Sequence, residues 1–229
     1  MKARPKLLDL FCGGGGAAIG YTQAGFDVTG VDITRQTNYP FGQIVADATR
    51  IRQKDLKRFD VIHASPPCQG YSIGTAVHRP GVRPGHMGKN EPKLIGVIHE
   101  MLVEADKPYV IENVVGAYDF MQDPILLCGT MFKLNIARHR LFETNMDLSP
   151  FDLPPHPMCK AIQLNYAKKN GINPRWMSIA GNPMGAGHTE LWRKLMGWPA
   201  EYRTSSRDLK EAIPPVFSKW LGEQLLDYL

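Results

Sequence analysis

The chain has 229 residues, of which 43% are hydrophobic and 21% charged, values that are ordinary for a globular protein. This length fits one α/β domain with a small additional lobe, and no run of about 18 apolar residues predicts a membrane span. The net charge of +5 is compatible with a polyanionic partner such as nucleic acid, but it does not establish one.

The four cysteines, Cys12, Cys68, Cys128 and Cys159, are widely separated and form no Cys-x-x-Cys pair. We therefore expect neither a disulfide framework nor a structural zinc site. His156 and Cys159 would supply two metal ligands, but the sequence shows no second pair, so a plain loop is favoured and no bound metal is predicted. Reduced thiols indicate a cytoplasmic protein, in a bacterium or in a virus-infected host cell.

The first two thirds of the chain alternate between predicted strands and helices. Compact apolar runs predict strands at 6–11, 27–33, 43–46, 59–64 and 109–111. Helices are predicted at 16–24, closed by Gly25, and at 92–105, where apolar residues recur at helical spacing. This alternation predicts an α/β fold with a doubly wound, mostly parallel sheet, in which ligands lie beyond the carboxyl ends of the strands.

The character of the chain changes after residue 145. Residues 149–157 hold four prolines and mark a boundary. Residues 158–188 show no regular pattern and are rich in Gly, Asn and Met, so we expect irregular structure there. Regular structure returns at Thr189, a candidate N-cap, and a last helix with an apolar stripe follows Pro215.

Residues 13–18, GGGGAA, contain the pattern G-x-G-x-x-A between a predicted strand and a predicted helix. Glycines allow a tight turn and close approach of a ligand, and the helix N-terminus offers free N–H groups. Asp32 ends the second strand, where a carboxylate can bind two ribose hydroxyls, and Asp47 ends the third, where it can accept from an adenine amino group. The pattern predicts a nucleoside cofactor without separating NAD from S-adenosylmethionine; a turn without a ligand is the alternative.

Residues 65–70, SPPCQG, place Cys68 behind two prolines at the exit of a predicted buried strand. A stiff backbone can aim a thiol, and a nucleophilic thiolate needs nearby cations or N–H groups to stabilise it. Glu112, at the end of the next strand, is expected to face the same crevice. Arg138 and Arg140 would point to one face of an extended segment. A buried structural cysteine and a charged surface segment are the alternatives.

Six stretches in this order resemble the DNA (cytosine-5)-methyltransferase family. They are LDLFCGGGGAAIGYTQAGF, ASPPCQGYS, VIENV, ARHRLFE, TELWRKLMGWPAEY and LKEAIPPVFSKWLGEQL. The resemblance covers residues 6–145 and 189–229. It implies a Rossmann-like methyltransferase that transfers a methyl group from S-adenosylmethionine to carbon 5 of a cytosine in duplex DNA, leaving S-adenosylhomocysteine.

The resemblance also implies catalytic roles. Cys68 would attack carbon 6 of the cytosine, Glu112 would protonate ring nitrogen 3, and Asn113 would help to fix the site. Arg140 and Arg138 would hold the base oxygen and the closed site. The covalent step makes carbon 5 electron-rich enough to take the methyl group; loss of the carbon 5 proton then expels Cys68. The target base must be flipped out of the duplex.

Two further groups of residues are expected to bind ligands. Those expected to contact the cofactor lie on the glycine turn and at strand ends: Asp9, Phe11, Gly13, Gly14, Gly15, Asp32, Ile33, Asp47, Ala48 and Pro66. Those expected to contact DNA follow the nucleophile: Gln69, Ser72, Arg79, Arg83 and Lys89. Most of the second group belong to the glycine-rich segment 71–91, which is expected to close on the phosphates.

The resemblance divides the chain into a catalytic and cofactor-binding domain, 1–148, a small target-recognition lobe, 149–188, and a C-terminal segment, 189–229, that returns to the first domain. Family members usually carry a larger recognition region than this lobe. Because a small lobe makes fewer base-edge contacts, we expect short or relaxed sequence specificity. The sequence also departs from the family pattern at Ala137 and at Lys210-Glu211.

We expect a monomer that acts on double-stranded DNA, with a restriction endonuclease as a candidate partner and no membrane association. The same chemistry on RNA or on free nucleotides is an alternative. A catalytically inactive DNA-binding relative is another, which the presence of Cys68, Glu112 and Arg140 disfavours. A nicotinamide oxidoreductase explains the glycine turn but not the PPCQG and ENV stretches.

Overall fold

The computed structural model describes residues 3–71, 92–148, 152–173, 177, 179 and 188–229. Within them, one sheet comprises β1 (Lys6–Leu10), β2 (Asp27–Asp32), β3 (Gly42–Val45), β4 (Val61–Ala64), β5 (Tyr109–Asn113), β6 (Ile125–Cys128) and β7 (His139–Thr144). The strand order is β3-β2-β1-β4-β5-β7-β6. Strand β7 is antiparallel to β5 and β6, and the other pairings are parallel. The predicted doubly wound, mostly parallel α/β fold is confirmed.

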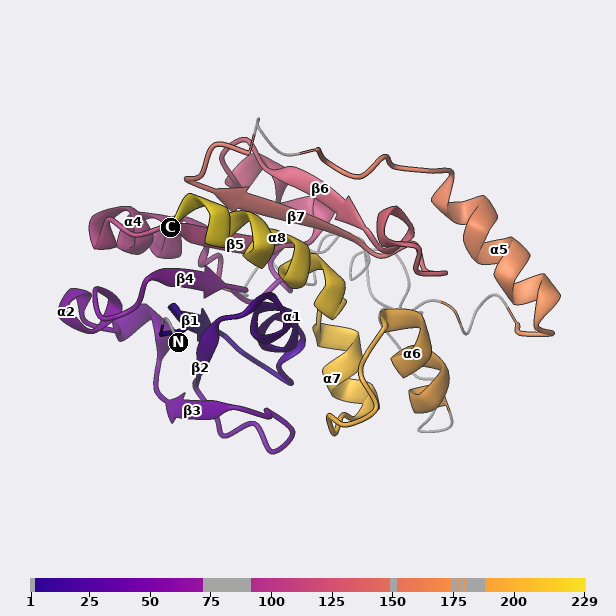
Figure 1. Cartoon of the computed structure of the whole chain (residues 1–229), viewed down its shortest axis with the longest axis horizontal. Coiled ribbons are helices and arrows are strands. Elements are labelled where there is room, and N and C mark those ends of the chain that lie inside the picture. Colours follow the sequence, from indigo (N-terminus) through magenta and orange to yellow (C-terminus); the bar gives the residue numbers. More distant parts are fainter. Residues whose placement is uncertain (1–2, 72–91, 149–151, 174–176, 178, 180–187) are drawn as a thin grey trace.

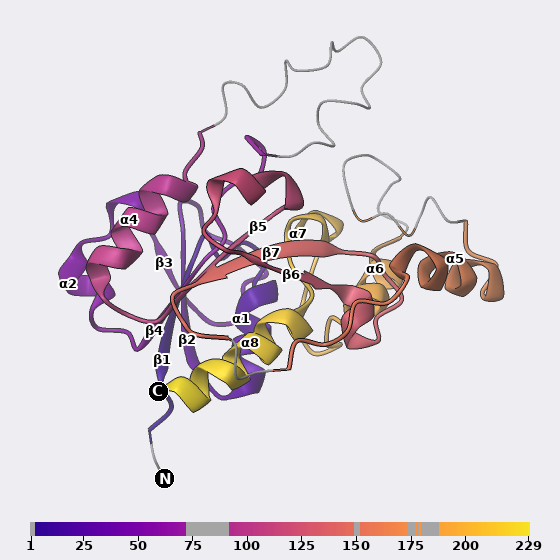
Figure 2. The ribbon, with the colours of Figure 1, turned by 90° about the horizontal axis from the view of Figure 1, so that it is seen from above.

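Helices lie on both faces of this sheet (Figures 1 and 2). The α-helices are α1 (Gly16–Ala24), α2 (Gln53–Leu56), α4 (Ile95–Ala105), α5 (Cys159–Lys169), α6 (Thr189–Met196), α7 (Ser206–Glu211) and α8 (Pro215–Tyr228). Three short 3₁₀ helices are η1 (Ala48–Arg50), η2 (Val115–Phe120) and η3 (Gly129–Phe132). Among these described helices, none combines the length and the apolar character needed to traverse a membrane.

Successive residues of the central strands serve opposite faces of the sheet. Leu7 of β1 and Val61 of β4 belong to a buried cluster with side chains of α1 and α8. The residues that follow them, Leu8 and Ile62, belong to a second buried cluster with side chains of α4. This is the two-residue alternation of a strand buried on both sides, and it explains why most residues of these runs are apolar.

The C-terminal helix α8 lies directly against α1, the helix that follows the glycine turn (Figure 2). Glycines make this close approach possible. A Cβ added to Gly20 would overlap the carbonyl oxygen of Pro215 and the hydroxyl of Ser218, and one added to Gly222 would lie 2.8 Å from Cβ of Ala24. The last helix of the chain therefore supports the first, and with it the turn that precedes α1.

Two expectations about the second half of the chain were wrong. Residues 159–169 form α5 rather than irregular structure, and Thr189 is the first residue of α6 rather than its N-cap, which is His188. Helix α5 projects away from the sheet (Figures 1 and 2) and buries only Ala167, so its sequence carries no apolar stripe that a periodicity analysis can detect.

Candidate active site

Cys68, Glu112 and Arg140 come together beyond the carboxyl ends of the central parallel strands. Cys68 lies in the turn after β4, and Glu112 belongs to β5. Arg140 is on β7, which runs back along β5 in the antiparallel register. Its Nε lies 3.0 Å from Oε1 of Glu112, and both side chains are mostly buried. The antiparallel return of β7 therefore gives the strand-end carboxylate a cationic partner.

The turn that carries Cys68 is held on both sides. The Asn113 side-chain amide donates to the carbonyl oxygen of Pro66 at 3.0 Å. The backbone N–H of Ser65 donates to the carbonyl of Leu10 at the end of β1, at 3.1 Å, and Tyr71 N–H donates to the Cys68 carbonyl at 3.0 Å. These contacts fix the backbone around the thiol without occupying its sulfur.

Burial controls the protonation of the two central groups. Burial and the nearby Glu112 raise the pKa of Cys68, and the opposing effect of Arg140 and Arg138 is smaller. Burial also raises the pKa of Glu112, although Arg140, Ser65 and Arg138 act to lower it. The cations expected near the thiol are therefore present, but they do not bring its pKa below the ordinary value. The site holds a thiol beside a carboxyl group that retains its proton more readily than usual.

A buried hydrogen-bonded chain, missed by the sequence analysis, reaches Glu112 from α1. The hydroxyl of Tyr21 lies 3.0 Å from Nδ1 of His63, whose Nε2 lies 2.9 Å from Oγ of Ser65. Ser65 in turn hydrogen-bonds Glu112. Burial lowers the pKa of His63 to about 3, so its imidazole is neutral. The signal was one polar residue on the same face of each central strand: Asp9 opposite His63, and Glu112 two residues after the Val110 that pairs with His63.

Arg138 contacts a different set of groups from Arg140. Its side chain is buried, and its two terminal nitrogens donate to the carbonyl oxygens of Ile179 (2.7 Å), Lys210 (2.7 Å) and Ala212 (2.5 Å). Arg138 thus joins the start of β7 to the segment between α7 and α8. Its donors are directed at the protein's own backbone, whereas Arg140 faces Glu112.

The glycine turn brings several predicted cofactor residues together. Asp32 Oδ2 accepts from the N–H of Gly13 at 3.1 Å, and its Oδ1 accepts from the N–H of Thr34 at 3.1 Å. A Cβ on Gly13 would meet nothing within 4 Å, which leaves open space beside this carboxylate. The neighbouring Ile33 side chain is 70% exposed. Phe11 enters the turn with a left-handed φ of 60°. These features fit a nucleoside ligand, because Ile33 can pack on the flat face of a base and Asp32 can accept from ribose hydroxyls.

Gly14 and Gly15 make room for the protein's own side chains. A Cβ on Gly14 would lie 2.5 Å from Cβ of Asp208, and one on Gly15 would lie 2.9 Å from the Pro40 ring. Gly15, with a φ of 90°, is also the residue that precedes α1. Both glycines shape the turn through packing, in addition to any approach of a ligand.

The remaining predicted cofactor residues occupy distinct environments. Burial raises the pKa of Asp9 to about 8, and within the described residues its Oδ1 has no hydrogen-bond partner. Asp47 caps η1 by accepting from the N–H and hydroxyl of Thr49, and these hydrogen bonds lower its pKa. Ala48 and Pro66 are buried. Asp9 therefore offers a buried carboxyl oxygen without a partner among the described residues, while Asp47 is already partly satisfied.

Of the predicted DNA contacts, Gln69 is exposed next to Cys68. The other four, Ser72, Arg79, Arg83 and Lys89, lie outside the described residues. A cavity of about 350 Å³ lies between the start of β7 and α5. Its lining includes Arg138, His139, Arg140, Lys160 and Gln163. The cavity connects the arginine-bearing strand with the helix of the expected lobe.

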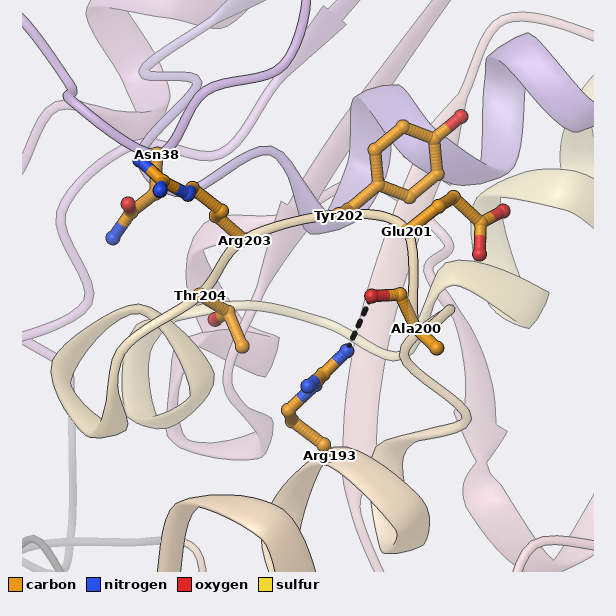
Figure 3. A pocket seen from close by; sticks show the side chains of 7 residues that line it. All are labelled: Asn38, Arg193, Ala200, Glu201, Tyr202, Arg203 and Thr204. Carbon is orange, nitrogen blue, oxygen red and sulfur yellow. Dashed lines mark hydrogen bonds between the residues drawn. The ribbon is translucent and has the colours of Figure 1, made fainter.

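A second hollow, of about 400 Å³, is lined by Asn38, Arg193 and residues 200–204 (Figure 3). In it, Arg193 of α6 donates to the carbonyl oxygen of Ala200 at 3.0 Å. None of the predicted catalytic or cofactor residues lines this hollow.

Comparison with known proteins gives one family and several relatives. The family model for C-5 cytosine-specific DNA methylases matches residues 5–123. The type II methyltransferase M.AgeI of Thalassovita gelatinovora is 27% identical over 171 residues, 66% of this chain and 37% of that protein. M1.HphI of Haemophilus parahaemolyticus is 31% identical over 86 residues, 31% of this chain and 23% of that protein. The chain thus matches well under half the length of these curated relatives.

Two solved structures resemble the whole chain. The Entamoeba histolytica methyltransferase EhMeth superposes with a TM-score of 0.62 at 13% identity, covering 99% of each chain. The Schizosaccharomyces pombe methyltransferase Dnmt2 superposes with a TM-score of 0.59 at 14% identity, again covering 99% of each. At these identities the likeness shows a shared fold.

Proposed function

Because the chain belongs to the family of C-5 cytosine-specific DNA methylases, we propose that it methylates carbon 5 of a flipped-out cytosine in double-stranded DNA, with S-adenosylmethionine as methyl donor. The observation that supports this most strongly is the cluster of Cys68, Glu112 and Arg140 beyond the strand ends, with Glu112 and Arg140 3.0 Å apart. It combines a nucleophile, a proton donor and a cation in one place, as covalent attack on a pyrimidine requires.

Neutral cytosine is a poor carbon nucleophile, so the proposed reaction begins with two coupled steps. The Cys68 thiol gives up its proton to solvent, and the thiolate sulfur forms a bond to carbon 6 while Glu112 transfers its own proton to ring nitrogen 3. The raised pKa of Glu112 supports the second role, because the group is a proton donor only while protonated. A protonated Glu112 also no longer repels a thiolate, so Arg140 can then favour the charged sulfur.

The positioning of these groups falls to residues that touch neither the base nor the methyl donor. Asn113 hydrogen-bonds the Pro66 carbonyl. The series of side-chain hydrogen bonds from Tyr21 through His63 to Ser65 positions Glu112. In place of the base-binding role predicted for Arg138, we propose that it holds the C-terminal segment against β7. Arg140 is the arginine we assign to the base oxygen.

S-adenosylmethionine supplies the methyl group when it is bound. We propose that Asp32 accepts from its ribose hydroxyls and that Ile33 packs on its adenine ring. Gly13 lies at open space next to Asp32, and Asp9 offers a buried oxygen with no partner in the described part of the chain. We propose that Asp47 accepts a hydrogen bond from the adenine amino group through Oδ2. In the structure this oxygen lies 3.3 Å from Nε of Arg50.

We expect the described residues of the recognition lobe at 149–188 to make few contacts with DNA. Its described part consists of one helix, α5, preceded by an extended segment, and α5 lines the cavity that Arg140 also lines. We therefore propose a short or relaxed target sequence. The relatives named as type II methyltransferases support a partner restriction endonuclease.

The direct test is transfer of tritiated methyl groups from S-adenosylmethionine to duplex DNA, RNA and free cytosine nucleotides in parallel. We expect label in duplex DNA, and bisulfite sequencing of the product then gives the target site. Cys68→Ala is expected to bind S-adenosylhomocysteine normally but to transfer no label. Label confined to RNA or to nucleotides would replace DNA as the substrate, and no label in any substrate would favour an inactive DNA-binding relative.

A further inference from the structure

Four potential metal ligands that lie far apart in the sequence meet at one end of the β6–β7 hairpin. They are Cys128, His139, His156 and Cys159, and their ligand atoms all lie within 4.8 Å of one another. Cys128 ends β6 and His139 begins β7, where the antiparallel register places them directly opposite each other. Cys159 is the first residue of α5, and His156 lies three residues before it. The second ligand pair that the sequence analysis did not find is thus supplied by strand pairing.

Two separations within this cluster match the edges of a tetrahedral zinc site. Nε2 of His139 lies 3.2 Å from Nε2 of His156, and Sγ of Cys159 lies 3.6 Å from the same His139 atom. With Zn–N bonds of about 2.05 Å and Zn–S bonds of about 2.3 Å, a regular tetrahedron has N···N edges of about 3.3 Å and N···S edges of about 3.6 Å.

Hydrogen bonding alone is a poor account of this convergence. Two imidazole Nε2 atoms face each other, so one of them must carry a proton, and a thiol approaches the same His139 nitrogen. A cation at the centre would instead use a lone pair from every group at once. The hydroxyl of Thr130 lies 3.3 Å from Sγ of Cys128, where it can donate to a metal-bound thiolate.

We propose that Cys128, His139, His156 and Cys159 bind one Zn²⁺ ion as a structural site. Two thiolates and two imidazoles in tetrahedral positions select zinc over magnesium or calcium, which prefer oxygen ligands. Four protein ligands leave no open position for water or substrate, so the ion has a structural role. This proposal does not depend on the proposed methyl transfer.

The position of the site suggests what the ion holds in place. Its ligands come from the β6–β7 hairpin and from the start of α5, a helix that projects from the sheet and buries a single residue (Figures 1 and 2). His139 also lies between Arg138 and Arg140. A bound ion would therefore fix α5 to the strand that carries the ion-pair partner of Glu112.

The test measures metal content in the full chain. The protein is purified without chelators and passed through gel filtration. Elemental mass spectrometry is then expected to find about one zinc per chain. Replacement by Co²⁺ is expected to give the strong visible bands of a tetrahedral ion and a thiolate-to-cobalt charge-transfer band. Competition with a chromophoric chelator then gives the affinity.

Two ligand variants and one control make the assignment specific. His156→Ala is suitable because His156 is exposed, so circular dichroism should show an intact fold while zinc affinity falls by at least ~100-fold. Cys128→Ser should lose the charge-transfer intensity of one thiolate. Cys68→Ser removes a thiol outside the cluster and should keep both zinc and the cobalt spectrum.

Three results would overturn the proposal. The first is less than ~0.1 equivalent of metal after equilibration with equimolar Zn²⁺. The second is an unchanged affinity and cobalt spectrum in His156→Ala. The third is a Cys128–Cys159 disulfide in protein prepared under reducing conditions, because those sulfurs would then be unable to bind the ion.

Discussion

Arg140 and Glu112 form an ion pair of 3.0 Å between Nε and Oε1 in a mostly buried setting. Burial raises the pKa of the carboxyl group more than Arg140 lowers it, so Glu112 keeps its proton to a higher pH than an ordinary glutamate. Cys68 responds to the same balance, because burial and the Glu112 charge both raise the pKa of its thiol. The protonation states of the two groups are therefore coupled, and this coupling can be measured without a substrate.

Glu112→Gln is expected to lower the pKa of Cys68, because it removes the neighbouring negative charge while keeping a similar shape. In the native protein, the alkylation rate of Cys68 by iodoacetamide should still rise above pH ~8.5, where a free cysteine is half ionised. In the variant the midpoint should shift to lower pH, and the rate at pH 8 should increase several-fold. Peptide mass spectrometry measures the rate at Cys68 separately from the other thiols.

Glu100→Gln on the exposed side of α4 is the matched control and should leave the Cys68 midpoint unchanged. A midpoint that stays the same or rises in Glu112→Gln would show that the carboxylate does not act on the thiol.

Arg138→Gln is expected to reduce the free energy of unfolding by about 2–4 kcal/mol. The variant removes the guanidinium donors of three carbonyl oxygens in a buried region, and charged hydrogen bonds of this kind are the stronger ones. Urea unfolding followed by circular dichroism gives the value. Arg207→Gln, at an exposed ion pair on α7, should change it by less than about 0.5 kcal/mol. Equal stability of the two variants would refute a positioning role for Arg138.

Gly20→Ala is expected to destabilise the protein by at least about 2 kcal/mol, because its methyl group would overlap the Pro215 carbonyl and push α1 away from α8. Gly96→Ala is the matched control in α4, where an added Cβ meets nothing within 4 Å. It should stabilise the protein by up to about 1 kcal/mol through the better helix propensity of alanine. Thermal unfolding of both variants distinguishes the packing effect from the propensity effect, and similar midpoints would contradict the close α1–α8 contact.

Asp32→Ala is expected to weaken S-adenosylhomocysteine binding by about 10- to 100-fold, the cost of losing charge-assisted hydrogen bonds to two hydroxyls. The variant also removes the acceptor of the Gly13 N–H, which shapes the turn. Isothermal titration calorimetry measures the affinity. Asp27→Ala, at the exposed opposite end of β2, is the control and should bind normally. Unchanged binding by Asp32→Ala would remove Asp32 from the cofactor site.

The sequence predicted the parts of the fold that rest on continuous burial. The runs at 7–10 and 61–64 are buried on both faces and mostly apolar, and the glycine turn lies between strand and helix as predicted. Strands β6 and β7 and helix α5 were not predicted: the two strands are antiparallel additions at one end of the sheet, and α5 buries only Ala167. Continuous burial supplied the signal in the first group, whereas β6 is buried only at Leu127 and Cys128 and α5 only at Ala167.

The candidate site shows the same division. Cys68 and Glu112 were predicted together because each lies at the end of a predicted strand, and Arg140 was added from the Arg-His-Arg spacing and the family resemblance. The structure brings the three together. The different surroundings of Arg138 depend on carbonyl groups more than 40 residues away, which no local pattern reveals. The opposition of Cys128 and His139 depends on antiparallel register. Contacts set by register or by distant backbone can be read only from the folded chain.

The most direct test of the proposed mechanism is covalent capture of Cys68. Duplex DNA carrying 5-fluorocytosine at the target site, incubated with the protein and S-adenosylmethionine, should give a denaturation-resistant complex, because fluorine cannot leave as the carbon 5 proton does. Mass spectrometry should place the DNA on the Cys68 peptide, and Cys68→Ser should form no complex. Methyl transfer by Cys68→Ala, or transfer by the native protein with no trapped complex, would contradict a covalent mechanism.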